Sequence, residues 1–241
     1  MSVAIVTGGS RGIGRAIAQR LGADGAAVVV NYHSNRSAAE QVVSAIERAG
    51  GQAAAVRADV ADPAQLRSLF DVAEERFGGL DILVNNVGTA RFAPIAEATD
   101  EDFDLTFAVN TKATFIALRE AANRLRDNGR IVVVSSGVTA THRPNSGIYA
   151  ASKAAGEELV RVLAKELGHR GITANCVLPG AIRTEALAAA RSTSLTEQII
   201  DMTPLGRIGE PADIGDIVAF LASDAARWIT GETLHAGGGL F

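Results

Sequence analysis

Tyr149 and Lys153 are the two side chains whose types and spacing best suit chemistry. The chain has only two tyrosines and three lysines, so this pairing at an offset of four residues is seldom met by chance. Residues four apart lie on one face of a helix, where a phenol and an ammonium can act together. An ordinary phenol titrates near pH 10, and a nearby cation lowers that pKa by about 1 to 3 units. The pair therefore predicts an acid/base that exchanges a proton with a carbonyl or alcohol oxygen.

A hydroxyl donor that polarises the reacting oxygen is expected beside this pair. Ser135 and Ser136 directly follow the apolar run 131–134, which predicts a strand. Ligands bind at the carboxyl ends of strands in open α/β sheets, so either hydroxyl could hold the substrate oxygen. The spacing of these residues leaves both serines open.

A glycine-rich turn follows the first apolar run of the chain. Its spacing is Gly-x-x-x-Gly-x-Gly, which differs from the common G-x-G-x-x-G fingerprint. Glycines allow a tight turn and a close approach, so backbone N–H groups at the start of the next helix can face a pyrophosphate. An ordinary surface turn is the alternative. The position after the first strand favours a dinucleotide site that includes Gly8, Ser10, Arg11, Gly12, Ile13 and Gly14.

The end of the second apolar run indicates which dinucleotide is preferred. NAD-binding domains carry a carboxylate there, about 20 residues after the glycines, for the ribose 2′-hydroxyl. Arg11 would instead meet a 2′-phosphate, with Arg36 as a further donor. NADP(H) is therefore favoured over NAD(H), the alternative being that both arginines are solvated surface charges. Residues 31–34, at the end of the second apolar run, include no carboxylate. They are expected to contact the cofactor as well, and are Asn31, Tyr32, His33 and Ser34.

The elements that position these residues alternate between short apolar runs and helical periods. The runs are apolar on consecutive residues, which indicates a parallel sheet covered by helices on both faces. We therefore expect one doubly wound, Rossmann-type α/β domain over residues 1–241, with a seven-stranded parallel sheet. The predicted strands are 3–6, 27–30, 53–56, 82–84, 131–134, 172–178 and one near 233.

Helices are predicted between these strands and after them. Ser37 and Glu40 suggest a capping box for the second helix, and Asp62 followed by Pro63 predicts the start of the third. Residues 181–205 are rich in Ala, Ser and Thr and lack a core pattern, so they are predicted to form a mobile loop over the substrate site. Later helices are expected at 100–126, 149–168 and 211–222.

Composition excludes several other classes of protein. The formal charge of −4 comes without any basic block, and aromatic residues make up 5%, so nucleic-acid binding is not expected. No window approaches about 18 uninterrupted apolar residues, which argues against a membrane span. Cys176 is the single cysteine and forms no intrachain disulfide, which suits the cytoplasm. The four histidines lack metal-site spacing, so no metal is expected.

The order of the motifs resembles the short-chain dehydrogenase/reductase family over essentially all 241 residues. In that family the catalytic serine lies 13 residues before the tyrosine, which selects Ser136 over Ser135. Val87 departs from the family, which usually has Ala there. The matching stretches are Thr7-Gly8-x-x-x-Gly12-x-Gly14, Asp59-Val60, Asn85-Asn86-Val87-Gly88, Asn110, Ser136, Tyr149-x-x-x-Lys153 and Pro179-Gly180-x-x-x-Thr184.

The resemblance implies a role for each of these residues. Tyr149 is the acid/base, and Ser136 orients the carbonyl. Lys153 binds the nicotinamide ribose and lowers the Tyr149 pKa, while Asn110 holds a water that links Lys153 to solvent. The further cofactor contacts that it implies are Asp59, Val60, Asn86, Val87, Gly88, Pro179, Gly180, Ile182 and Thr184.

The resemblance also implies an activity and an assembly. The chain is similar to the 3-oxoacyl-carrier-protein reductase and carbonyl reductase group, which reduces a small-molecule carbonyl substrate with NADP(H). A homotetramer, or a dimer, would form through the later helices, and Phe103, Phe107, Phe115 and Leu118 serve either this interface or the core. Two alternatives are an NAD(P)-dependent dehydrogenase of a sugar, polyol or hydroxysteroid, and a catalytically silent regulator that senses dinucleotides.

Overall fold

A parallel sheet forms the centre of the protein, which a computed structural model describes at residues 1–185, 187 and 193–241. Within those residues, seven strands pair in the order β3-β2-β1-β4-β5-β6-β7. The predicted seven-stranded, doubly wound fold is confirmed. The strands are β1 (Val3–Val6), β2 (Ala27–Tyr32), β3 (Gln52–Arg57), β4 (Ile82–Asn85), β5 (Arg130–Val134), β6 (Thr173–Pro179) and β7 (Thr233–Ala236).

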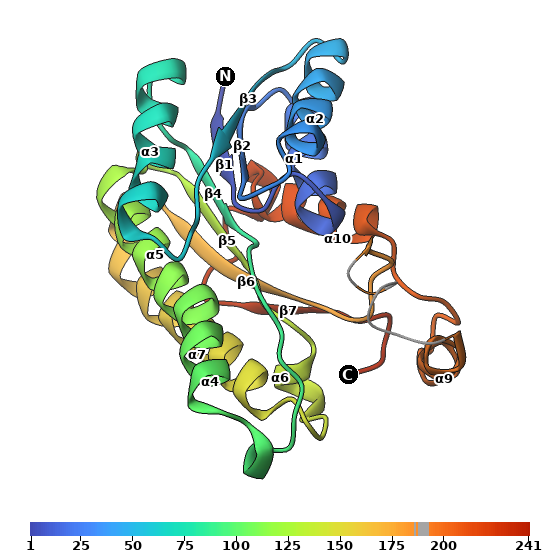
Figure 1. The fold of residues 1–241 in the computed structure, drawn as a ribbon. Helices are drawn as coiled ribbons and strands as arrows, with labels where there is room; N and C mark the ends of the chain where they lie inside the picture. Colours follow the sequence, from blue (N-terminus) through green and yellow to red (C-terminus); the bar gives the residue numbers. More distant parts are fainter. Residues whose placement is uncertain (186, 188–192) are drawn as a thin grey trace.

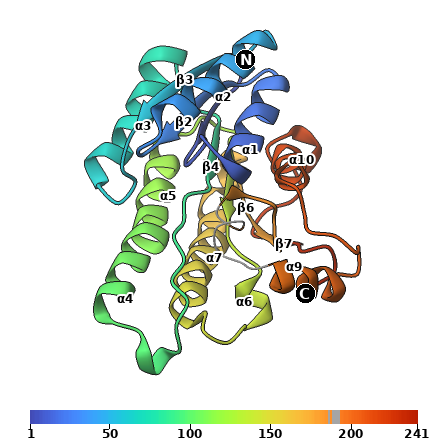
Figure 2. The same ribbon diagram turned by 45° about the vertical axis from the view of Figure 1, so that its right-hand side comes forward.

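Helices cover both faces of this sheet (Figure 1). One face carries α3 (Pro63–Phe77), α5 (Ala113–Arg124) and α7 (Gly147–Leu167), and the other carries α1 (Gly12–Ala23), α2 (Arg36–Arg48) and α10 (Pro211–Leu221). Figure 2 shows α4 (Asp100–Phe107), α6 (Val138–Thr141) and α9 (Thr193–Met202) toward the end of the molecule away from the N-terminus. Short 3-10 turns cover Ile95–Glu97, Gly168–Arg170 and Asp224–Ala226. Across the described residues, no helix is both long enough and apolar enough to span a membrane.

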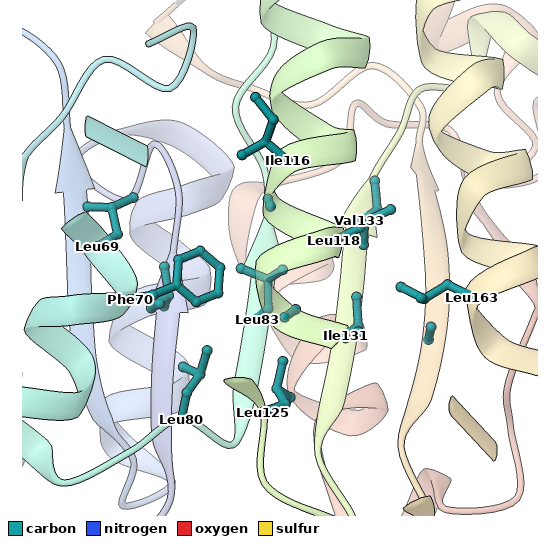
Figure 3. Packing of buried hydrophobic residues seen from close by; sticks show 14 of the residues in the cluster. Leu69, Phe70, Leu80, Leu83, Ile116, Leu118, Leu125, Ile131, Val133 and Leu163 are labelled. Atoms are coloured by element: carbon teal, nitrogen blue, oxygen red, sulfur yellow. The ribbon is translucent and has the colours of Figure 1, made fainter. Parts of the chain in front are cut away.

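The strands are apolar on both sides because each side faces a helical layer. Successive side chains of β5 alternate between the two cores, so Ile131 belongs to the core on the side of α3, α5 and α7, while Val132 belongs to the core on the side of α1, α2 and α10. Figure 3 shows the first of these cores, where Phe70 of α3 and Leu118 of α5 pack against the strands. This burial explains why consecutive apolar residues, rather than alternating ones, marked the strands in the sequence.

The strand order reverses at β1, which lies between β2 and β4. The chain leaves the carboxyl end of β1 toward one side of the sheet and later continues from β4 toward the other. In doubly wound sheets such a reversal opens a crevice at the carboxyl ends of the two strands, and ligands bind there. The glycine-rich turn after β1 and the Asn86–Gly88 segment after β4 both lie at this place.

Several predicted helix details hold and others do not. α7 and α10 match the predictions at 149–168 and 211–222, and Asp62 caps α3 with its side chain. The predicted capping box of Ser37 and Glu40 is wrong, because Asn35 accepts the N–H of Ala38 and so caps α2 two residues earlier. The predicted helix at 100–126 is interrupted by a π-helical turn at Ala108–Lys112.

The structure describes only part of the loop that was predicted at residues 181–205. Residues 186 and 188–192 lie outside the described part of the chain. Within the remainder, α9 occupies Thr193–Met202, and Ile182 forms an isolated bridge with Gly209. The predicted mobility of the loop stays a prediction.

Candidate active site

Ser136 and Tyr149 meet beyond the carboxyl end of β5. Ser136 lies two residues after that strand, and Tyr149 is in the first turn of α7. Their hydroxyl groups form a hydrogen bond. Burial raises the pKa of Tyr149, and this hydrogen bond acts in the opposite direction. Ser135 points elsewhere and donates to Glu157 Oε1 at 2.6 Å, so the structure selects Ser136 as the neighbour of the phenol.

Lys153 lies one turn after Tyr149 and is almost fully buried. Its Nζ donates to the Val134 carbonyl oxygen at 3.0 Å. Burial lowers the pKa of Lys153 to about 8. In this structure burial raises the pKa of Tyr149 and the opposing effect comes from Ser136, so the expected lowering of that pKa by Lys153 stays a prediction. The ammonium is directed at the end of β5.

Asn110 lies in the π-helical turn between α4 and α5, a kind of turn that often occurs at functional sites. Its Nδ2 donates to Thr89 O at 2.8 Å and to Ser152 Oγ at 2.9 Å, and its Oδ1 accepts from Thr89 N at 2.8 Å. A Cβ at Gly88 would lie 3.3 Å from Asn110 Oδ1 and 2.8 Å from Lys153 Nζ. The structure therefore brings Asn110, Gly88 and Lys153 together. The water that Asn110 was expected to hold stays a prediction.

The glycine-rich turn has no room for side chains at its centre. A Cβ at Gly14 would overlap the Gly8 carbonyl oxygen, and a Cβ at Gly8 would lie 3.0 Å from Val87 Cγ2. Gly8 and Gly12 have φ values of 62° and 50°, in the left-handed region that favours glycine. The tight turn leaves the N-terminus of α1 at the crevice, which is a suitable place for a pyrophosphate.

The residues between these glycines point in different directions. Ser10 is buried, Arg11 is exposed at the N-cap of α1, and Ile13 packs against the α1 core. A Cβ at Gly12 would lie 3.1 Å from Thr184 Cγ2, so the segment after β6 reaches the turn as predicted. Arg15 extends this contact by an ion pair of 2.7 Å with Glu185.

The end of β2 divides the four residues expected to contact a cofactor. Asn31 and Tyr32 are buried within the strand, whereas His33 and Ser34 are exposed beyond it. Asn31 Oδ1 accepts from Gly8 N at 3.0 Å, and its Nδ2 donates to Ala58 O at 3.0 Å. The amide of Asn31 therefore positions the glycine-rich turn instead of facing the 2′-phosphate directly.

The ends of β3 and β4 contribute the next group of predicted residues. Asp59 is partly exposed and lies 3.8 Å from His33 Nε2, while Val60 is buried in the core. Asn86 Nδ2 donates to Thr7 O at 3.0 Å, and Thr7 Oγ1 accepts from Asn86 N at 2.9 Å. Thr7 thus joins β1 to β4 beneath the crevice, a role that its place in the motif did not reveal.

Pro179, Gly180 and Ile182 follow one another out of β6. Pro179 ends the strand, and Ile182 is buried against the α10 side of the sheet. A cavity of about 230 Å³ lies on this side, and its lining includes Gly180, Ile182, Thr203, Arg207 and Asp213. The cavity is separate from the Ser136–Tyr149 pair, which belongs to the α7 side.

Phe92 and Arg143 form a wall beside Tyr149 that the sequence did not predict. The Phe92 ring meets the Tyr149 ring edge to face, with centroids 5.7 Å apart, and the Arg143 guanidinium lies 5.3 Å from the centre of the Phe92 ring. The backbone N–H of Ala93 donates to Asn145 O at 2.9 Å and ties the two loops together. Such loop residues follow no helical or strand period, so only their aromatic and cationic types offered a signal.

The described residues fit the dinucleotide implied by the motifs. The positions of Gly8, Gly14 and Gly88 form a cradle that side chains would fill, and Arg11 offers an exposed cation at its edge. These features lie along the carboxyl ends of β1 and β4, where a dinucleotide binds in doubly wound sheets. In the part of the chain that the structure describes, no group of three His, Cys, Asp or Glu side chains could hold a metal ion.

Comparison with known proteins gives matches over nearly the whole chain. A sequence profile described as enoyl-(acyl carrier protein) reductase matches residues 8–241. An NADPH-dependent aldehyde reductase-like protein of Arabidopsis thaliana, described as chloroplastic, is 46% identical over 98% of this chain and 93% of its own length.

Solved structures agree with this result. The angucycline C-6 ketoreductase LanV, crystallised with bound NADP, is 42% identical, with a TM-score of 0.94 over 99% of this chain and 95% of that one. A short-chain dehydrogenase/reductase from Serratia marcescens is 40% identical, with a TM-score of 0.95 over 99% of this chain and 97% of that one.

Proposed function

Because this chain belongs to the short-chain dehydrogenase/reductase family, we propose that it uses NADPH to reduce a ketone or aldehyde carbonyl to an alcohol. The observation that carries this proposal is the hydrogen-bonded pair of Ser136 and Tyr149, with Lys153 one turn further along the same helix. The aldehyde reductase-like relative and the NADP-bound ketoreductase support the reaction type and the choice of cofactor.

The side chains divide the work of the reduction. Bound NADPH supplies the hydride. Ser136 donates a hydrogen bond to the carbonyl oxygen, and Tyr149 transfers its proton to that oxygen as negative charge develops. Burial raises the pKa of Tyr149, so the phenol holds its proton at neutral pH and is ready to act as the acid. Lys153 uses one N–H donor on Val134 O, and its other N–H groups would donate to the nicotinamide ribose of bound NADPH.

The remaining groups orient the cofactor and the substrate. The N-terminus of α1 would face the pyrophosphate of the bound cofactor, and Arg11 would pair with its 2′-phosphate. Phe92 gives the substrate an apolar wall beside Tyr149. Small ketones and 3-oxoacyl thioesters are the substrates that we propose, because each presents one carbonyl to the Ser136–Tyr149 pair.

The test is a carbonyl panel assayed by the loss of NADPH absorbance, with alcohol products measured in parallel. The panel contains small ketones, aldehydes and acetoacetyl thioesters. NADPH consumption matched by alcohol formation is the expected result. NADPH binding without turnover on every compound would favour a dinucleotide sensor. Faster oxidation of a sugar, polyol or hydroxysteroid than any reduction would favour the dehydrogenase alternative.

A further inference from the structure

Glu157 is a buried carboxylate that the reaction above does not use. Its side chain is only 7% exposed, and it lies one turn after Lys153 on α7. The same helix therefore carries Tyr149, Lys153, Glu157 and Arg161 at successive steps of four residues, which places them in one row. Carboxylates are almost never buried without a partner, so the surroundings of Glu157 explain what it does.

Two groups hold the Glu157 carboxylate. Ser135 Oγ donates to Oε1 at 2.6 Å, and Arg161 Nη2 lies 3.6 Å from Oε2. Arg161 is far more exposed and also pairs with Glu158 at 2.8 Å. Ser135 directly precedes Ser136, so its hydrogen bond with Glu157 connects the strand end that carries Ser136 to the helix that carries Tyr149 and Lys153.

The electrostatic effect of Glu157 falls on Lys153. Burial lowers the pKa of Lys153, while Cys176 of β6 and Glu157 act in the opposite direction. Burial raises the pKa of Cys176 to about 12, so the thiol carries no charge at neutral pH. Val134 O, Gly88 and Asn110, which also lie near Lys153, are uncharged, and Tyr149 one turn before it on α7 has a pKa raised by burial and keeps its proton. Glu157 is therefore the acidic side chain that acts against the effect of burial on Lys153.

We propose that Glu157 is a positioning residue that keeps Lys153 in its ammonium form during the reaction, and that Ser135 holds the Glu157 carboxylate in place. The inference rests on the proposed function, because the protonated lysine is the form that donates all of its hydrogen bonds to Val134 O and the nicotinamide ribose. It adds a charged residue below the Ser136, Tyr149 and Lys153 group.

The test compares Glu157→Gln with Glu158→Gln. Glutamine keeps the size of Glu157 and still accepts from Ser135 Oγ, while it removes the charge. Glu158 is the next residue on α7, is exposed and also contacts Arg161, so its variant is a matched control. The chain has three lysines, and NMR of lysine labelled at the side chain therefore follows Lys153 through a pH titration, with Lys153→Met identifying its signal.

A lower Lys153 pKa in Glu157→Gln is the expected result, by on the order of one unit, with no change in Glu158→Gln. A lower pKa means that the ammonium is lost at lower pH. The alkaline limb of the plot of kcat against pH therefore moves to lower pH by the same amount. An unchanged Lys153 titration in Glu157→Gln overturns the proposal, and so does an equal shift in Glu158→Gln.

The NMR titration requires neither NADPH nor a carbonyl substrate. It therefore tests the role of Glu157 even if the panel of carbonyls finds no reduction. Should Glu157→Gln fail to fold, Ser135→Ala provides the second variant, because it removes the donor that holds the carboxylate. A fall of the Lys153 pKa below that of the parent protein in Ser135→Ala supports the proposal, and an unchanged or higher pKa contradicts it.

Discussion

Tyr149 keeps its proton at neutral pH because burial raises a pKa that already lies near 10. A protonated phenol is the form that reduction of a carbonyl requires, whereas oxidation of an alcohol requires the phenolate. The environment of this single hydroxyl therefore suits the role of acid that we propose for Tyr149. Ser136, whose hydroxyl contacts the phenol, is the group that moves the pKa back toward its ordinary value.

Replacing Tyr149 by Phe removes the transferable proton and leaves the ring in place. Turnover of the best carbonyl substrate is expected to fall by about 10²-fold or more, because general acid catalysis contributes that much. NADPH binding, measured by fluorescence titration, is expected to persist. Unchanged turnover would refute the assignment of Tyr149, and joint loss of turnover and NADPH binding would point to a structural role.

Arg11 is the single residue that we propose sets the preference for the 2′-phosphate of NADP(H). Arg11→Ala is expected to weaken NADPH binding by about 10-fold while NADH binding changes little, since one charge-assisted contact with phosphate is lost. Arg20→Ala is the control, because Arg20 is also exposed on α1 but pairs with Asp24 at 3.0 Å. Equal losses for NADPH and NADH in Arg11→Ala would mean that Arg11 only supports the turn.

At the scale of elements, the turn between β1 and α1 is held from two neighbouring strands. Asn31 of β2 accepts from Gly8 N and donates to Ala58 O, and Thr7 binds the backbone N–H of Asn86 after β4. These bonds join β1 to its neighbours β2 and β4 on both sides of the point where the strand order reverses. The shape of the turn therefore depends on the sheet around it. Small glycines complete the turn because α1 begins directly against it.

Gly14→Ala tests this close packing. The added Cβ overlaps the Gly8 carbonyl oxygen, so the turn must shift, with an expected loss of about 1–3 kcal/mol in the free energy of unfolding and weaker NADPH binding. Gly168→Ala is the control, because a Cβ there meets no atom within 4 Å and φ is −56°. Urea unfolding and NADPH titration measure both effects. Equal behaviour of the two variants would contradict the role of Gly14.

Elements were predictable from sequence where one local pattern dominated. The strands follow apolar runs, and Asp62 with Pro63 marks the start of α3. The cap of α2 was misplaced because Asn35, Ser37 and Glu40 are all suitable capping residues, and the backbone path out of β2 selects Asn35. No local sequence pattern predicts the π-helical turn at Asn110. It goes with hydrogen bonds that the Asn110 side chain donates to Thr89 O and Ser152 Oγ, both distant in the chain.

At the scale of the whole molecule, we propose that copies of this chain assemble into a homotetramer, with a dimer as the smaller possibility. Phe103, Leu105 and Phe115 of α4 and α5 remain exposed by 44%, 45% and 44%. Phe115 also lines a hollow of about 460 Å³ with Phe107 and Lys112. A surface of exposed aromatic side chains over adjacent helices suits contact with a second copy.

Phe115→Glu places a charge on that surface. The unmodified chain is expected to sediment as a tetramer of about 100 kDa, since each chain has a mass of 24.9 kDa, and the variant is expected to sediment as smaller species. Arg48→Glu at the end of α2 also introduces a carboxylate on the surface and is expected to leave the assembly unchanged. A parent protein that sediments as a monomer contradicts the proposal.

The sequence by itself determined where the strands lie along the chain, the glycine-rich turn and the placing of Tyr149 and Lys153 one turn apart, because each depends on residues close together in the chain. The tertiary structure alone decided which of two adjacent serines reaches the phenol and which one binds Glu157. It also buried Leu118 in the core while leaving Phe115 exposed. These outcomes depend on contacts between residues 13 or more positions apart or on different elements, and no local spacing encodes such contacts.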